Sequence, residues 1–387
     1  MVEHSDHNAK ETLCFPKSCY EKIGTISRYR RGSFPQPYDN DEWYDGINSM
    51  PFVQVADISD DFRLNDKTNK RISLKAQKMS VFVPKGTVLV SLQGSIGRAA
   101  ITQYDAYVDR TVAIFRDFRH DINKKYFMYQ LYSVFSVEKQ SARGSTIKTI
   151  TKKEFTDFEI PVPEPFEQKE ISKTLSLFDT YIADLTELIE KKKGIRDGAL
   201  EELVSGRTRL DGYEYEWQEG KIGDILKILH GKNQREVESY SGKYPILGTG
   251  GIIGKATEFL CDWECVLIGR KGTIDNPMYM NTPFWTIDTL YYSKPTDNQC
   301  VKFQYYLFCT INWYDYTESS GRPSLAKKVI EAIPIRIPRY EEQVKIAKVL
   351  TAMDKEIADL ETERKKIIQI REGAMDDLLT GRVRLTM

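Results

Sequence analysis

An internal repeat constrains this chain more than any other feature. Residues 160–210 align with residues 335–385 without a gap, at a constant offset of 175, and 22 of the 51 aligned positions are identical. The first copy opens IPVPEPFEQKE and closes SGRTRL, and the second opens IRIPRYEEQVK and closes TGRVRL. A chain that repeats so long a segment is expected to build one structural element twice.

Each copy is predicted to form one long helix. Pro163 and Pro338 suit a chain that enters a helix, and the acidic residues just after them suit the positive N-terminal end. Gly206 and Gly381 suit a left-handed residue at the C-terminal end. About 35 helical residues would extend roughly 50 Å, which is a length suited to a spacer.

The apolar residues of both copies are spaced alternately by three and four. This spacing predicts a coiled-coil seam, although two helices that pack as ordinary core would also explain it. Arg196 and Arg371 fall at the same position of the continued seam, where a polar residue would fix the register. The seam residues are Leu175, Phe178, Ile182, Leu185 and Ile189 in the first copy, and Leu350, Met353, Ile357 and Leu360 in the second.

The segments that precede the two helices are also related, but only at short motifs. Strands that run into glycine turns are predicted at matching places, and the rest of each module diverges. Loop glycines, Gly144 and Gly321, precede the helices. The paired motifs are Lys22–Ile26 with Gly32 and Lys221–Ile225 with Gly231, Val88–Ile96 and Val266–Ile274, and Tyr107–Asp109 and Thr286–Asp288.

The chain of 387 residues is therefore predicted to have an α+β fold. Two mixed α/β modules alternate with two long helices that pair antiparallel as a coiled coil, with pseudo-two-fold symmetry. The expected divisions are a disordered leader at 1–19, the first module at 20–158, the first helical region at 159–211, the second module at 212–333 and the second helical region at 334–387.

Two related but different modules suit duplex DNA, whose antiparallel strands have local two-fold symmetry. Two modules that differ would each bind one half of an asymmetric site. The 56 basic and 56 acidic residues cancel over the chain. Residues 20–158 nevertheless carry 22 basic and 16 acidic groups, a net of +6, whereas residues 212–333 carry 13 and 15, a net of −2. The second module would therefore need a local basic patch.

The candidate DNA-binding residues lie beside the module glycines and on the predicted loops. Arg28, Arg30 and Arg31 beside Gly32, and Lys232, Gln234 and Arg235 beside Gly231, are expected at equivalent places in the two modules. Arginine, lysine and glutamine are suitable readers of base edges, although charged clusters are more often solvated surface. The other candidates are Gln93, Ser95, Arg98, Arg143, Lys148, Lys271, Thr273, Arg322, Lys327 and Lys328.

Over residues 20–385 the chain resembles the specificity subunits of type I restriction-modification systems, which act in phage defence. The resemblance rests on Pro163–Gln168 and Pro338–Gln343, and on the helix ends Ser205–Arg207 and Thr380–Arg382. It implies that the modules are target recognition domains, each of which binds half of a bipartite site on double-stranded DNA. The first module departs from the pattern, because no tryptophan stands at its start where the second has Trp217.

The resemblance also implies partners and no active site in this chain. The helical regions, with Gln168, Gln343 and the seam residues, would serve as spacer and as binding sites for two modification subunits. Those subunits would carry S-adenosylmethionine, and restriction subunits that use ATP and Mg²⁺ would join them. This chain would hold no cofactor and no metal.

Two rival functions stay open at this stage. An adenine methyltransferase is suggested by Asn276–Tyr279, one residue short of Asn-Pro-Pro-Tyr, and by the glycines Gly248, Gly250, Gly251 and Gly254. A coiled-coil scaffold that binds no DNA would explain the helices but not the paired modules.

The cellular context is expected to be the cytoplasm. There is no run of about 18 apolar residues and no basic, apolar start typical of a signal peptide. The six cysteines are therefore expected to be reduced. Cys261 and Cys265 could begin a zinc site, but two buried thiols are the more ordinary interpretation.

Overall fold

The computed structural model describes residues 14–141, 152–317, 321 and 323–385. Three candidate contact residues, Arg143, Lys148 and Arg322, lie outside this range. The chain divides into two compact units, with unit 1 formed by residues up to 187 and from 361 onward, and unit 2 by residues 188–360. Each unit therefore combines one module with part of both long helices. The division differs from the expected one, in which modules and helices were separate.

Unit 1 contains two four-stranded sheets that share a hydrophobic cluster. The sheets have the strand orders β2-β9-β6-β7 and β4-β3-β8-β5, and a separate pair joins β1 to β10. The elements are β1 (Tyr20–Lys22), α1 (Ile23–Ile26), β2 (Arg28–Arg31), β3 (Met50–Val53), β4 (Lys70–Ile72), α2 (Leu74–Gln77), β5 (Val81–Val83), β6 (Val88–Ser91), β7 (Ala99–Ile101), β8 (Ala106–Val108), β9 (Val112–Arg116), α3 (Lys124–Ser141), α4 (Lys152–Asp157) and β10 (Glu159–Pro161).

Unit 2 repeats this plan with one strand fewer among its described residues. Its sheets have the orders β12-β18-β15-β16 and β14-β13-β17, and β11 pairs with β19. The elements are β11 (Gln218–Lys221), α6 (Ile222–Ile225), β12 (Leu226–His230), β13 (Tyr244–Gly248), β14 (Gly251–Ala256), β15 (Cys265–Gly269), β16 (Met278–Met280), β17 (Trp285–Thr286), β18 (Leu290–Pro295), α7 (Val301–Thr310), α8 (Lys327–Ala332) and β19 (Pro334–Ile337).

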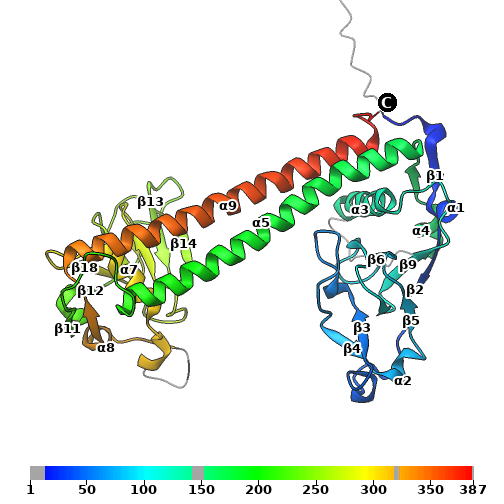
Figure 1. Ribbon diagram of the computed structural model, residues 1–387. Coiled ribbons are helices and arrows are strands. Elements are labelled where there is room, and N and C mark those ends of the chain that lie inside the picture. The colour runs from blue at the N-terminus through cyan, green and yellow to red at the C-terminus, as the bar shows by residue number, and fades with distance from the viewer. Residues whose placement is uncertain (1–13, 142–151, 318–320, 322, 386–387) are drawn as a thin grey trace, which may run out of the picture. The chain divides into compact units, whose positions relative to one another are not determined.

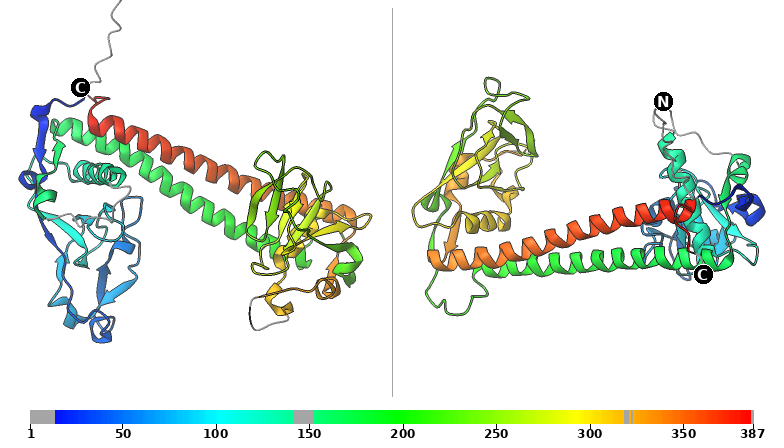
Figure 2. Two further views of the ribbon diagram at one scale, coloured as in Figure 1. Left: turned by 180° about the vertical axis from the view of Figure 1, so that it is seen from behind. Right: turned by 90° about the horizontal axis from the view of Figure 1, so that it is seen from above.

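The two copies of the sequence repeat each form one helix of 41 residues, α5 (Pro165–Ser205) and α9 (Tyr340–Thr380). Within unit 1 the start of α5 lies antiparallel to the end of α9, with α3 beside both (Figures 1 and 2). Within unit 2 Lys192 of α5 pairs with Glu356 of α9 at 2.7 Å, again in antiparallel order. The predicted antiparallel pairing of long helices is therefore confirmed.

The predicted seam is the buried face of these helices. Leu175, Ile182, Leu185 and Ile189 are buried on α5, as are Leu350 and Ile357 on α9. Phe178, Met353 and Leu360 are half-buried. Packing of this face against a second helix and a module is what fixes helices of this length, because helical propensity alone contributes little.

The start of the chain is more ordered than the sequence suggested. Phe15 is only 3% exposed and packs against Gly381, where an added Cβ would lie 2.6 Å from its ring. Trp217 covers Gly206 in the same manner, with its ring 3.2 Å from an added Cβ. Phe15 is thus the counterpart of Trp217, and its burial orders residues 14–19, which the sequence analysis had assigned to the leader.

A glycine at the same place in each module lets two backbone segments of that module pack closely. A Cβ on Gly32 would lie 2.1 Å from the carbonyl oxygen of Val108, and a Cβ on Gly231 would lie 2.0 Å from that of Ile287. The motifs that the sequence pairs at Tyr107–Asp109 and Thr286–Asp288 are therefore the segments against which these glycines pack. Only glycine permits so close an approach of two backbones.

We expect Gly231→Ala to destabilise unit 2 by about 1–3 kcal/mol, because the new methyl group overlaps the Ile287 carbonyl, which also accepts a hydrogen bond from the backbone of Leu290. Urea denaturation of the whole chain measures this. Gly373→Ala is the control, since Gly373 lies in α9 with open space around it and alanine should stabilise the helix by up to about 1 kcal/mol. Equal stability of the two variants would contradict the packing role.

Candidate nucleic-acid interface

The three candidate arginines beside Gly32 lie on β2, an edge strand of its sheet. Tyr29 points into the core and packs edge-on against Phe155, with ring centroids 4.8 Å apart. Alternation along the strand therefore directs Arg28 and Arg30 to the opposite face, and both are exposed. Arg31 is exposed at the end of the strand.

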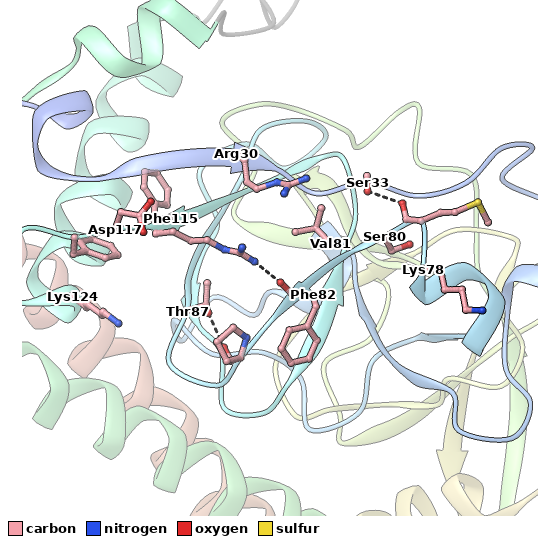
Figure 3. A pocket seen from close by; sticks show the side chains of 14 residues that line it. Arg30, Ser33, Lys78, Ser80, Val81, Phe82, Thr87, Phe115, Asp117 and Lys124 are labelled. Atoms are coloured by element: carbon pink, nitrogen blue, oxygen red, sulfur yellow. Dashed lines mark hydrogen bonds between the residues drawn. The ribbon is translucent and has the colours of Figure 1, made fainter.

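Arg30 lines an open pocket of about 900 Å³ in unit 1 (Figure 3). Three further cations, Lys78, Arg116 and Lys124, line the same pocket with Phe82 and Asp117. The guanidinium of Arg116 donates to the carbonyl of Phe82, which ties β9 to β5. These further cations could not be found from the sequence, because they come from three separate elements and no motif joins them.

The loop that follows β6 presents some of its expected residues and not others. Gln93 and Ser95 are exposed on a turn that contains Gly94 at φ +68°. Arg98 donates to the carbonyl of Ile58 at 3.1 Å and lies 3.4 Å from a carboxylate oxygen of Asp60. Arg98 is therefore held within unit 1 by contacts of its own, which weakens its candidacy as a DNA reader.

The expected equivalence of the two basic patches is wrong. Arg28, Arg30 and Arg31 precede Gly32 on a strand, whereas Lys232, Gln234 and Arg235 follow Gly231 on a loop. The packing of the glycines fixes the register, and in that register the counterparts of the three arginines are Lys227, Leu229 and His230.

The second module presents its candidates on two loops and at the start of the helix α8. Lys232 and Arg235 are exposed after β12, and Gln234 is half-buried there. Lys271 and Thr273 are exposed on the turn after β15, as predicted for a strand that runs into a glycine turn. Lys328 is exposed at the start of α8, while Lys327 lies 3.7 Å from Glu331 and is less available.

The repeat motifs at the ends of the helices bind each other inside each unit. Glu167 is 4% exposed and accepts two hydrogen bonds from the guanidinium of Arg384, both at 2.8 Å. Glu342 is 2% exposed and accepts two from Arg209, at 2.7 and 2.9 Å. The opening motif of one copy therefore pairs with the closing motif of the other, in both units.

Gln168 and Gln343 have the same internal role in the two units. The amide of Gln168 donates to the carbonyl of Pro163 at 2.8 Å and accepts from the backbone of Asn123 at 2.9 Å. Gln343 does the same with Pro338 and Cys300, both at 3.0 Å. Both glutamines are buried. Gln168 therefore anchors the start of α3 and Gln343 the start of α7, and neither side chain is available to a partner subunit.

The seam arginines belong to matching polar networks. Arg371 lies 3.2 Å from Asp179, which also accepts a hydrogen bond from Tyr129. In unit 2 Arg196 lies 3.4 Å from Asp354, which accepts from Tyr306 at 2.7 Å. Burial raises the pKa of the Asp179 carboxyl, although Tyr129 and Arg371 act to lower it.

Family comparison decides the class of protein. A model of the type I restriction modification DNA specificity domain matches residues 11–194 and 214–370, one match for each module with its helix. The chain belongs to the type I restriction-modification DNA specificity family.

Relatives cover the chain almost completely. It is 23% identical to the specificity subunit of the type I restriction enzyme EcoprrI from Escherichia coli, over 86% of each protein. It is 24% identical to the MjaVIII specificity subunit from Methanocaldococcus jannaschii, over 94% of this chain and 92% of the relative. The crystal structure of an S subunit from M. genitalium has the same fold, with a TM-score of 0.62, 21% identity and coverage of 93% of this chain and 95% of that one.

The two segments that suggested a methyltransferase form ordinary elements of the second module. Gly248, Gly250 and Gly251 form the turn of the hairpin between β13 and β14, whereas a cofactor loop would join a strand to a helix. Tyr279 lies in the edge strand β16, and its hydroxyl donates to Glu264. The glycine segment therefore lacks the strand-to-helix arrangement of a cofactor loop.

The cysteine pair behaves as the ordinary interpretation expected. The Cys261 and Cys265 sulfurs are 3.9 Å apart and both residues are buried. Over the described ranges no group of three metal-binding side chains gathers, and no helix has the length and apolar character to cross a membrane.

Proposed function

We propose that this chain is the DNA-reading subunit of a type I restriction-modification enzyme, and that each unit reads one half of a split, asymmetric site. The observation that carries this proposal is the pair of modules with the same strand order but different exposed side chains. Two modules with a shared fold but different exposed side chains suit the recognition of two different DNA half-sites. The family assignment supports DNA recognition and assembly with the other subunits of the system.

We further propose that two modification subunits bind, one to each unit, and that restriction subunits join them. Ile195 and Ile370 occupy the same position of the sequence repeat, and they are 60% and 53% exposed. The matched place of these two residues, one on each unit, suits two copies of one partner.

Methyl transfer is expected only in the complex. The purified chain should transfer no methyl group from S-adenosylmethionine to DNA, because its glycine segment forms a hairpin turn and its Asn276–Tyr279 segment lacks the second proline of Asn-Pro-Pro-Tyr. Addition of its modification subunit should produce adenine methylation at one bipartite sequence, which methylation mapping of the product identifies. Methyl transfer by the isolated chain would favour the rival enzyme, and a complex that binds no DNA would favour a scaffold.

A further inference from the structure

The pocket beside β2 gathers positive charge that the protein leaves uncompensated. Across the part of the chain that the structure describes, Arg30, Lys78 and Lys124 form no ion pair, and all three are exposed. Only one acidic residue, Asp117, lines the pocket with them. In Figure 3 the side chains of Arg30, Lys78 and Lys124 lie on different sides of Phe82.

This arrangement suits a phosphodiester group. Several cations around an open pocket attract the spread negative charge of a phosphodiester. A single arginine guanidinium, with two parallel N–H donors, would instead suit one carboxylate. Phe82 is 41% exposed and gives a sugar or base an apolar surface beside the charges. The ammonium nitrogen of Lys124 lies 5.7 Å from the centroid of the Phe118 ring.

Unit 2 keeps fewer of these charges at the matching places, although Lys294 stands where unit 1 has Arg116. In the register that the glycines fix, Leu229 stands where unit 1 has Arg30. Val301, which is buried, stands where unit 1 has Lys124, and the pairing that β5 makes in unit 1 is reduced in unit 2 to a single bridge between Cys261 and Phe284. The two modules therefore differ in charge at one defined site as well as in net charge.

We propose that this pocket of unit 1 binds the DNA phosphate backbone and gives unit 1 a larger share of the salt-dependent binding than unit 2 has. Unit 2 then depends more on contacts that do not neutralise phosphates. The inference rests on the proposed function, because it assigns the backbone contact within the same DNA-reading chain.

The test is the salt dependence of DNA affinity, measured on the full chain bound to its modification subunit with a duplex that carries the mapped site. Each neutralised phosphate contributes about 0.9 to the slope of log affinity against log salt concentration. The double variant Lys78→Ala with Lys124→Ala should therefore have a shallower slope, reduced in magnitude by about 1.8. Between about 50 and 200 mM salt, the wild-type complex should lose roughly tenfold more affinity than this variant.

A charge-matched control is Lys17→Ala with Lys125→Ala, two exposed lysines of unit 1 that do not line the pocket. The control should keep the wild-type slope, and both variants should methylate the original sequence. An equal fall of the slope in both would show that bulk charge acts, and an unchanged slope in the pocket variant would show that it binds no phosphate. Either result would contradict the proposal that this pocket binds phosphate, but neither would contradict the proposed function. A wild-type complex that binds no DNA overturns both.

Discussion

Arg371→Met should lower the free energy of unfolding of unit 1 by about 3–5 kcal/mol, because it leaves the Asp179 carboxylate buried without its cation. Methionine keeps the length of the side chain, so the packing against the seam is largely retained. Urea denaturation together with amide hydrogen exchange in α3, α5 and α9 would locate the loss in unit 1.

The loss should also depend on pH. Burial already raises the pKa of Asp179 in the folded protein, and removal of Arg371 raises it further. The folded variant then holds a proton that the unfolded chain releases, so its stability is greatest below the unfolded pKa of about 4 and falls as pH rises through the folded pKa. Stability curves at pH 5 and pH 8 should therefore diverge more for Arg371→Met than for the wild type.

The second unit provides the matched control. Arg196 and Asp354 form the equivalent pair, but their side chains are 29% and 35% exposed, so water screens the charge that remains. Arg196→Met should cost about 0–1 kcal/mol. Equal losses in the two variants would mean that burial is not the cause. Asp179→Leu added to Arg371→Met should recover much of the stability if the unpaired carboxylate is the cause.

The sequence predicted the features that depend on local periodicity. The two long helices, their antiparallel pairing and the strand-to-glycine turns after β6 and β15 follow from the repeat and from apolar spacing. The closing motifs were visible as well, but their partners were not. Nothing in the sequence says that Glu167 meets Arg384, 217 residues away, because that contact exists only after the helices pack antiparallel.

The features that were missed depend on register or on distant elements. The two basic patches look equivalent because both lie beside a glycine, yet one precedes and the other follows it, and only the packing of Gly32 and Gly231 reveals this. Phe15 was overlooked because a single aromatic residue in a polar leader gives no periodic pattern. The pocket cations share a site only because β2, α2 and α3 converge.

The helices offer a test of what sets the distance between half-sites. A four-residue insertion adds about 6 Å of helix and rotates the distal part of that helix by roughly 40°. If the helices set the separation, insertions in both α5 and α9 should lengthen the gap in the recognised sequence by about one or two base pairs and leave both half-sites unchanged.

The contacts within each unit indicate where the insertions belong. An insertion after Leu185, matched after Leu360, separates Thr186 from the unit 1 contacts, including its hydrogen bond to Arg364 at 3.3 Å. Moving the α5 insertion to follow Glu187 places both at the division between the units, so contacts within each unit keep their register. A four-residue insertion still shifts the heptad pattern, but equally on both helices.

Methylation mapping in a host that carries the doubled insertion measures the result. Base contacts come from the modules, whereas separation would come from helix length, so sequence content and spacing should change independently. An insertion in α5 alone is the control, because unequal helices cannot keep both seams paired and should abolish methylation instead of moving it. If the double variant folds, binds its modification subunit and still methylates at the original spacing, helix length does not set the distance, and the partner subunits or the modules must do so.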